Sequence, residues 1–130
     1  MDVPDGFSEF DPQGPFLQQI GPIQANEDGV FGLRAEERHT NHRGTIQGGL
    51  LASFADFVLG RAIGADADDD KSRATVSLTV DYLRPASPGD WIEGRARVER
   101  VGGTLSFADV ALTVDGREIV RARAVFVVAG

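Results

Sequence analysis

The chain has 130 residues, of which 42% are hydrophobic and 25% are charged, so residues 1–130 are expected to form one globular domain. Thirteen basic and 20 acidic residues give a net charge of −7, which argues against a nucleic-acid-binding protein whose affinity comes from phosphate neutralisation. A monomer of this length buries only about two-thirds of its unfolded surface, so a partner subunit is expected to add to the core.

The sequence contains no cysteine, which excludes disulfides, a thiol nucleophile, Cys-type zinc sites and iron–sulfur clusters and is typical of a cytoplasmic protein. Residues 1–11 are acidic and lack the features of a secretory signal. The most apolar run, residues 50–63, is interrupted by Ser53, Asp56 and Arg61, and is too short and too charged for a membrane span. We therefore expect a cytoplasmic protein without a membrane partner.

The first quarter of the chain predicts little regular structure. Residues 1–15 contain three prolines and two glycines, so an irregular lead-in is expected before a helical turn at residues 16–20. Residues 23–27 and 30–36 flank Asp28-Gly29, a pair favoured in tight hairpin turns. They predict two antiparallel strands.

A polar loop, residues 38–45, leads into the most helix-like stretch, residues 46–63. Gly64 stands where a C-terminal cap is expected, and the acidic residues 65–72 predict a solvated loop. Apolar side chains occupy nearly every face of the helix, which is typical of a helix buried in a core. They are Leu50, Leu51, Phe54, Phe57, Val58, Ala62 and Ile63.

The second half alternates apolar and polar residues and predicts four strands. They are residues 75–84, 91–101, 105–114 and 119–128. In the first of them, alternate residues from Val76 to Tyr82 are expected to share one face. Turn pairs between the runs predict that consecutive strands pair antiparallel. The sequence thus predicts an α+β fold in which an antiparallel sheet of about six strands curls around one long central helix.

Asp56 is the one carboxylate of the predicted core helix, where an unpaired charge is costly to bury. One interpretation places it on a narrow exposed stripe with Gln47, Ser53 and Gly60, or in a pair with an arginine. The other is a carboxylate set in a cleft as a nucleophile or general base, tuned by partial desolvation.

Gly48 and Gly49 stand at the expected start of the helix, although paired glycines cost about 2 kcal/mol relative to alanine there. The first N–H groups of a helix lack internal partners and lie at the positive end of its dipole. Without side chains in the way, an oxyanion could reach them directly. The glycines could equally allow close packing of the helix start against a strand.

Asp56 follows Gly48 by eight residues, which places the two about 12 Å apart along one helix. One chain cannot bring both to within about 3 Å of the same carbonyl group. If both act on one bond, Asp56 must come from an antiparallel helix of a second subunit. This predicts a homodimer with two composite sites, a pairing that would also cover an exposed sheet edge.

The remaining polar candidates lie before the helix and in the second half. His39 and His42 lack an obvious third ligand, so no metal site is expected. Residues 84–130 carry seven basic and six acidic residues, against six and 14 in residues 1–83, so an anionic ligand should prefer the second half. Arginines on solvated strand faces are the simpler interpretation of these charges.

Residues 39–60 read HTNHRGTIQGGLLASFADFVLG and contain a spaced motif. An Asn precedes a Gly by three residues, and two adjacent glycines are followed by an Asp eight residues after the first. The residues are Asn41, Gly44, Gly48, Gly49 and Asp56. This pattern resembles the signature of the hot-dog-fold acyl-CoA thioesterases of the phenylacetate-pathway type, within the 4-hydroxybenzoyl-CoA thioesterase superfamily. Residues 75–98 are similar to the family's strand, proline turn and strand.

The resemblance implies a role for several residues. The Gly48 amide would polarise a thioester carbonyl, Asp56 of the partner subunit would act as base or nucleophile, and Asn41 would place substrate or water. Gly49 and Thr75 would help to bind the substrate, Thr75 at the family's supporting hydroxyl position.

The family's pattern has His where this chain has Gln47. Gln cannot titrate near neutral pH but can donate and accept hydrogen bonds, so a positioning role is expected to survive. Arg84 is a candidate contact for the phosphates of coenzyme A. Coenzyme A is then part of the substrate, and no separate cofactor is expected.

Two other functions compete with thioester hydrolysis. A non-catalytic acyl-thioester-binding module could have lost turnover through Gln47, although a pure binder would gain nothing from a buried carboxylate. A hydratase of the same fold would need a histidine on or beside the helix, and the helix has none. Phe31, Phe54 and Phe57 could line an acyl pocket or simply form the core. The sequence does not distinguish a dimer from a tetramer.

Overall fold

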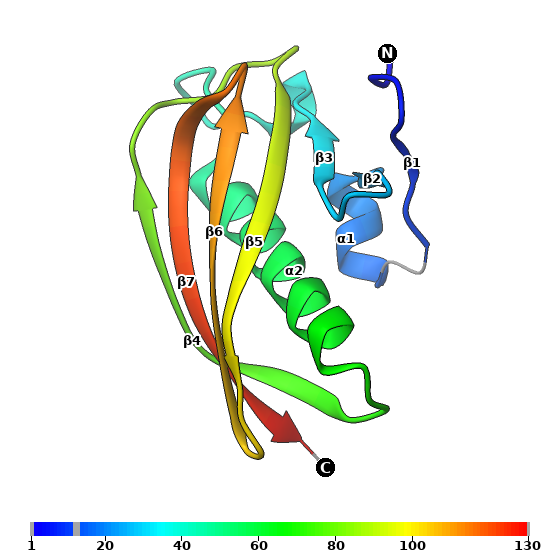
Figure 1. The fold of residues 1–130 in the computed structure, drawn as a ribbon. Coiled ribbons are helices and arrows are strands. Elements are labelled where there is room, and N and C mark those ends of the chain that lie inside the picture. Colours follow the sequence, from blue (N-terminus) through cyan, green and yellow to red (C-terminus); the bar gives the residue numbers. More distant parts are fainter. Residues whose placement is uncertain (1, 12–13, 130) are drawn as a thin grey trace.

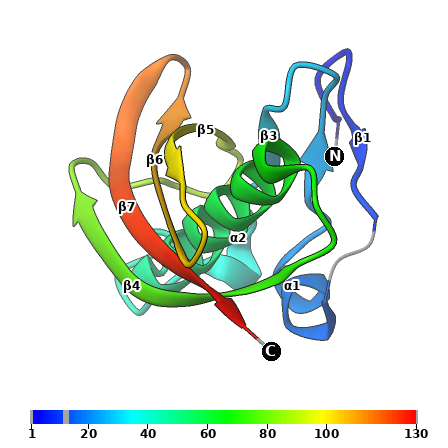
Figure 2. The same cartoon turned by 60° about the horizontal axis from the view of Figure 1, so that its bottom comes forward.

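The longest helix, α2 (Gly48–Ala67), lies in the concave face of a seven-stranded antiparallel sheet (Figure 1, Figure 2). This computed structural model describes residues 2–11 and 14–129. The sheet has the order β1-β2-β3-β5-β6-β7-β4. Its strands are β1 (Ser8–Glu9), β2 (Gln24–Ala25), β3 (Phe31–Arg34), β4 (Ser72–Tyr82), β5 (Trp91–Val101), β6 (Leu105–Val114) and β7 (Arg117–Ala129). The predicted sheet curled around one central helix is confirmed, with one strand more than the six expected.

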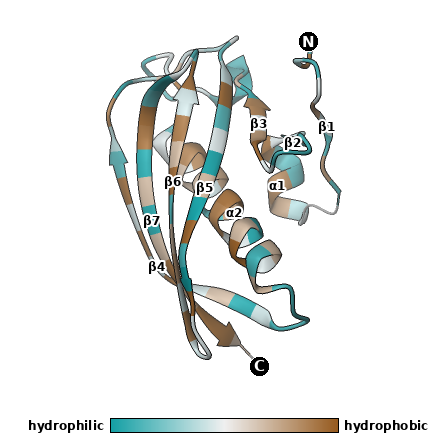
Figure 3. Cartoon of the chain, in the orientation of Figure 1, coloured by the Kyte–Doolittle hydropathy of each residue, from teal (hydrophilic) through white to brown (hydrophobic). Residues whose placement is uncertain are grey.

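The core lies between α2 and the strands β4 to β7, all of which α2 contacts. Alternate residues of these strands face the helix because successive side chains point to opposite faces of a sheet, and Figure 3 shows the resulting alternation of apolar and polar positions. The buried side chains of α2 are Leu50, Leu51, Phe54, Ala55, Val58, Leu59 and Ile63. On the outer face, charged side chains pair across strands, as Arg97 and Asp109 do at 2.8 Å.

The N-terminal segment is more regular than predicted. Residues 1–15 contain β1, which pairs with β2, and the expected helical turn is α1 (Pro15–Ile20). A 3-10 turn, η1 (Glu37–His39), precedes the loop that leads into α2. The expectation of a wholly irregular lead-in is therefore wrong, because β1 finds a partner strand that its own composition does not indicate.

Not all consecutive strands pair with each other. β5, β6 and β7 pair in chain order as expected, but β4 pairs with β7, and β5 pairs with β3. The connection from β4 to β5 is no hairpin: Leu83 N–H donates to Ile119 O at 2.8 Å, and Ala86 O accepts the Ile46 N–H at 2.9 Å. These bonds hold the connection across the end of the sheet (Figure 1).

Helix α2 continues beyond Gly64, where the sequence predicted its cap. Asp68 ends the helix in the left-handed conformation (φ 49°), and its N–H donates to Gly64 O at 3.2 Å. The intervening residues, 65–67, include two alanines, the strongest helix formers, and Asp tolerates the left-handed region.

Helix α2 extends beyond the run 50–63 and, with 20 residues, is long and apolar enough by length and composition alone to cross a membrane. The buried core helix of a soluble protein passes the same test. In this structure, α2 packs along the sheet with seven buried side chains.

Strand β4 is irregular between Thr75 and Ser77, where its register with β7 shifts by one residue. Val76 is therefore 60% exposed, whereas Leu78 and Val80 pack against the core. The prediction that Val76 shares their face is wrong, because an extra residue in one strand reverses the alternation of its side chains.

Gly32 of β3 lies directly under the indole ring of Trp91. A Cβ atom at position 32 would stand 2.0 Å from Cζ2 of Trp91. We expect Gly32→Ala to lower the free energy of unfolding by about 2–3 kcal/mol because the ring must move. Urea denaturation measures the change. Gly103→Ala is the control, since a Cβ there meets nothing within 4 Å; equal losses in both variants would contradict the prediction.

Candidate active site

At the N-terminus of α2, the first residue, Gly48, carries no side chain. Gln47 is the N-cap, with φ −58° and ψ 130°, and its side chain makes no capping hydrogen bond. Gly48 follows, and its carbonyl accepts a hydrogen bond from the Tyr82 hydroxyl at 2.7 Å. A Cβ atom at Gly48 would approach the Tyr82 ring to 3.3 Å. Glycine thus allows the close packing against β4, and it also leaves the first N–H of the helix without a covering side chain.

A cavity of about 430 Å³ opens at this helix start, here called the helix-start cavity. Gly48 and Gly49 contribute one wall, and the loop before α2 and the residues after β4 contribute the others. The remaining lining residues are Asn41, Arg43, Thr45, Ile46, Leu51, Tyr82, Leu83, Arg84 and Pro85. Two guanidinium groups and the positive end of the α2 dipole make the helix-start cavity suitable for an anion.

Asn41 orders the loop at this cavity. Its Oδ1 accepts the backbone N–H groups of Arg43 (2.8 Å) and Thr45 (3.3 Å), and its Nδ2 donates to the Thr45 hydroxyl at 3.0 Å. Gly44 takes a positive φ of 83° in the same turn. The side chain of Asn41 is thereby engaged within its own loop, as Asn side chains commonly are in turns.

Asp56 lies with Ser53 and Gly60 on a partly exposed stripe of α2, whereas one interpretation of the sequence expected a narrow exposed stripe. Its side chain is half-buried. The hydroxyl of Thr75 donates to Asp56 Oδ1 at 2.8 Å, so β4 holds the carboxylate in place through a neutral donor. Among the described residues, no arginine pairs with Asp56.

Asp56 lines a groove of about 690 Å³ between α1 and β4, here called the Asp56 groove. Its lining residues are Gly14, Pro15, Phe16, Leu17, Ser53, Asp56, Phe57, Gly60, Arg61, Arg73, Thr75 and Phe126. Five of the twelve have apolar side chains, two are glycines, and five are polar or charged. A carboxylate in such surroundings, with one fixed hydrogen bond, can act as a base or nucleophile towards a ligand in the groove.

Arg73 at the rim of this groove is paired with Asp69. Its two terminal nitrogens lie 3.0 and 2.9 Å from the two carboxylate oxygens. The hydrogen bonds from Arg73 lower the pKa of the Asp69 carboxyl to about 2. The guanidinium charge of Arg73 is therefore already balanced near the groove.

The predicted site residues fall into two groups. Asn41, Gly48, Gly49 and Arg84 line the helix-start cavity, and Asp56 and Thr75 line the Asp56 groove. None of the described residues lines both, and two turns of α2, about 12 Å, separate Gly48 from Asp56. Within one chain, the structure does not bring the two groups together.

Gln47 belongs to neither lining set. Its side chain is exposed, and its backbone N–H donates to His39 O at 2.9 Å. The backbone of Gln47 is therefore held by a hydrogen bond, whereas its side chain is exposed to solvent.

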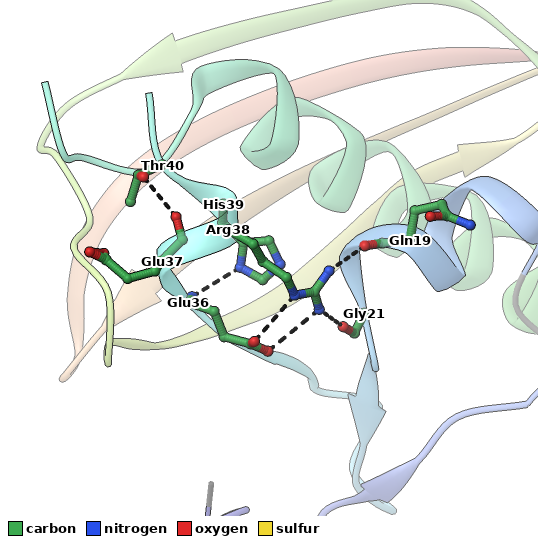
Figure 4. Close-up of polar contacts among 7 residues, drawn as sticks. All are labelled: Gln19, Gly21, Glu36, Glu37, Arg38, His39 and Thr40. Atoms are coloured by element: carbon green, nitrogen blue, oxygen red, sulfur yellow. Dashed lines mark hydrogen bonds and ion pairs between the residues drawn. The ribbon is translucent and has the colours of Figure 1, made fainter. Parts of the chain in front are cut away.

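The segment 36–39 connects the two parts of the site (Figure 4). Arg38 donates to the carbonyls of Gln19 and Gly21 at the end of α1 and pairs with Glu36 at 3.2 Å. The next residue, His39, receives the Gln47 N–H on its carbonyl. One short segment thus ties α1, which lines the Asp56 groove, to the residue before Gly48.

Sequence reasoning missed several lining residues. Tyr82, predicted on one strand face with Val80, reaches Gly48 with its hydroxyl, a contact that the sequence did not indicate. Phe16 was not singled out, and Arg43 only as part of the polar loop before the helix. Of the three aromatic residues suggested for an acyl pocket, Phe57 lines the groove. Phe31 and Phe54 are buried core residues.

His39 and His42 do not form part of a metal site in the described part of the chain, where no group of three or more His, Asp or Glu side chains is placed to hold an ion. His39 is buried, and its Nδ1 accepts the Glu36 N–H at 3.0 Å. This contact requires the neutral ring with its proton on Nε2.

Comparisons with known proteins show which proteins this chain resembles. Residues 43–120 match the sequence profile of the thioesterase superfamily. A presumed esterase of Pseudomonas aeruginosa is 36% identical over 130 residues, which cover 97% of each chain. Mouse acyl-coenzyme A thioesterase 13 is 34% identical over 89 residues, covering 68% of this chain and 63% of that protein.

A solved structure shows the same architecture. The phenylacetic acid degradation-related protein of Ralstonia eutropha JMP134 superposes with a TM-score of 0.77 and is 30% identical, over 91% of this chain and 93% of that chain. The likeness confirms the predicted hot-dog fold.

We expect the stability of the protein to fall between pH 7.5 and 5.5. Burial, together with the charge of Arg38, lowers the pKa of His39. The unfolded chain therefore binds more protons than the folded one below about pH 6.5, and stability is lost as the pH falls. Urea denaturation at both pH values measures this loss. His39→Gln should remove it and His42→Gln, at an exposed position, should keep it; the reverse pattern would contradict the assignment.

Proposed function

Because the chain belongs to the thioesterase superfamily, we propose that it hydrolyses an acyl-CoA thioester to the free acid and coenzyme A. The observation that carries the proposal is the Asp56 carboxylate, held by Thr75 in an open groove with an apolar wall. The kinship with an acyl-coenzyme A thioesterase supports coenzyme A as the thiol. The reaction needs only water as a second substrate.

The site is proposed to be composite, with Asp56 from one subunit and Gly48 from the other. On one chain the two are about 12 Å apart. Two α2 helices that run antiparallel across a two-fold axis bring the N-terminus of each to Asp56 of the other. The proposed active unit is therefore a homodimer, which leaves further association to a tetramer open.

The exposed edge of β4 supports this pairing. β4 is the last strand of the sheet and pairs with β7 on its other side. Three large apolar side chains on or beside it are about half exposed or more: Val76 (60%), Tyr82 (52%) and Leu83 (48%). An apolar edge strand of this length is normally covered, and a second copy of β4 covers it symmetrically.

In the proposed reaction, the Gly48 N–H donates to the thioester carbonyl oxygen and stabilises the oxyanion that forms there. Asp56 takes a proton from a water molecule, whose oxygen bonds to the acyl carbon. The C–S bond then breaks, and the proton passes to the sulfur of coenzyme A. In the alternative route, an Asp56 oxygen attacks the acyl carbon itself, and the C–S bond breaks to release the thiolate of coenzyme A. Water then hydrolyses the mixed anhydride, which regenerates Asp56 and supplies the proton for the thiolate.

The other predicted residues are assigned supporting roles. Thr75 orients the Asp56 carboxylate, and Asn41 shapes the loop beside Gly48. Gly49 leaves the helix start open to the substrate, and Gln47 places it by hydrogen bonding. Arg84 and Arg43 in the helix-start cavity are proposed to contact the phosphates of coenzyme A.

Asp56→Asn is expected to lower kcat by about 1,000-fold, because the amide neither accepts the proton nor attacks the acyl carbon. Thiol release from a panel of short, medium and aromatic acyl-CoA substrates measures the effect. Asp66→Asn, which changes an exposed carboxylate of the same helix outside both cavities, should change kcat less than about twofold.

A different result would identify the competing function. If the wild type releases no thiol from any substrate while acyl-CoA raises its melting temperature, the chain is an acyl-thioester-binding module. The solvent-facing Gln47 side chain, at the position of the family's histidine, favours this candidate.

Mixing two inactive variants tests the composite site. Gly48→Pro removes the proposed N–H donor at a position where the helix tolerates proline, and Gln47 already has the extended backbone that precedes proline. Co-refolded with Asp56→Asn, it should restore roughly a quarter of wild-type activity, because half of the dimers are mixed and each has one intact site. If both groups act within one chain, the mixture stays inactive.

A further inference from the structure

Five residues of α2 form the floor of the Asp56 groove. Their spacing of three and four residues places them on one stripe of the helix. They are Ser53, Asp56, Phe57, Gly60 and Arg61. Gly60 lies one turn beyond Asp56, about 6 Å along the helix axis, and adds no side chain to the floor.

The missing side chain at Gly60 opens the groove onto the ring of Phe126. A Cβ atom at position 60 would stand 3.5 Å from Cε1 and 3.7 Å from Cζ of Phe126, which is ordinary van der Waals contact. The backbone therefore does not require glycine here, and a branched side chain would fill the space over the ring. Glycine at this position leaves that space to a ligand.

The walls beside this space are apolar. Phe16 of α1 is 64% exposed although it is a large apolar side chain, and Leu17 stands next to it in the lining. Phe57 completes the apolar surface between α1 and α2. Covering such side chains with an apolar group is favourable by about 25 cal/mol per Å² removed from water.

Both arginines of the groove have contacts, although the buried Nε of Arg73 has no hydrogen-bond partner among the described residues. Arg73 pairs with Asp69 through two hydrogen bonds. The guanidinium of Arg61 lies 4.9 Å over the ring of Phe10, which is outside the groove lining. The surface between Asp56 and Phe126 therefore suits an uncharged group.

We propose that the acyl group of the substrate is uncharged and larger than acetyl, and that its far end lies over Gly60 against Phe126 and Phe16. Gly60 then sets the upper size of the acyl group. This inference rests on the proposed function, because it takes the thioester carbonyl to lie beside Asp56.

Gly60→Val and Gly64→Val form a matched pair for testing the size limit. Both add the same side chain to α2, and a Cβ at Gly64 meets nothing within 4 Å. The wild type should prefer hexanoyl-CoA and benzoyl-CoA to acetyl-CoA by at least about tenfold in kcat/KM.

In Gly60→Val, kcat/KM for the two larger substrates should fall by at least about tenfold and that for acetyl-CoA by less than about threefold. Gly64→Val should keep the wild-type preference. Equal effects of the two variants on all three substrates would overturn the inference.

Phe16→Ala tests the wall without disturbing the core, since the side chain is mostly exposed. It should lower the preference for hexanoyl-CoA over acetyl-CoA by about threefold or more. An unchanged preference would remove Phe16 from the acyl site.

A binding measurement separates this inference from the proposed function. In Asp56→Asn, calorimetry should show hexanoyl-CoA binding at least about tenfold more tightly than coenzyme A, a difference that Gly60→Val removes when added. If this binding pattern is found but the wild type releases no thiol, the acyl site is supported and the proposed hydrolysis is rejected. If thiol release depends on Asp56 but hexanoyl-CoA binds no more tightly than coenzyme A, the hydrolysis is supported and the acyl site is rejected. The same holds if Gly60→Val leaves the binding difference intact.

Discussion

The burial of one side of α2 against the sheet is the constraint on which the rest of the structure depends. Seven apolar side chains of the helix are buried, and α2 contacts β4 to β7. Asp56 and Gly60 lie at the edge of this packing, where they meet Thr75 of β4 and Phe126 of β7 and border the groove beside α1. The same packing fixes the direction of the helix and leaves its N-terminus at Gly48 open beside the following strand. A charged group on the buried side would cost several kcal/mol, so the carboxylate occupies the position that the core leaves free.

Strand β4 connects this constraint to the chemistry, because it contacts α2 at both functional points. Thr75 donates to Asp56, and Tyr82 donates to Gly48 O. The register shift after Thr75 turns Val76 outward on the free edge of the sheet. The strand that orients the carboxylate and supports the glycine is therefore also the apolar edge proposed to meet a second subunit. Segment 36–39 adds a second connection, from α1 to the residue before Gly48.

Much of the site could be predicted because its signals are local. A carboxylate in an apolar helix and paired glycines at a helix start are anomalies that a single stretch of sequence displays, and Asp56 and Gly48 were identified in this way. Thr75 was assigned through family resemblance, and the structure places its hydroxyl on the Asp56 carboxylate. Phe16 and Phe126 were missed, because each meets the site only through packing between segments far apart in the chain.

The sequence by itself determined the central helix, the four long strands and the helical spacing of about 12 Å between Gly48 and Asp56, since helix geometry follows from local backbone hydrogen bonds. Only the tertiary structure decided that β4 pairs with β7 and that α1 forms a wall beside Asp56. These outcomes depend on which distant segments bury each other's apolar surface. Periodicity indicates that a face must be covered, but it does not say which segment covers it.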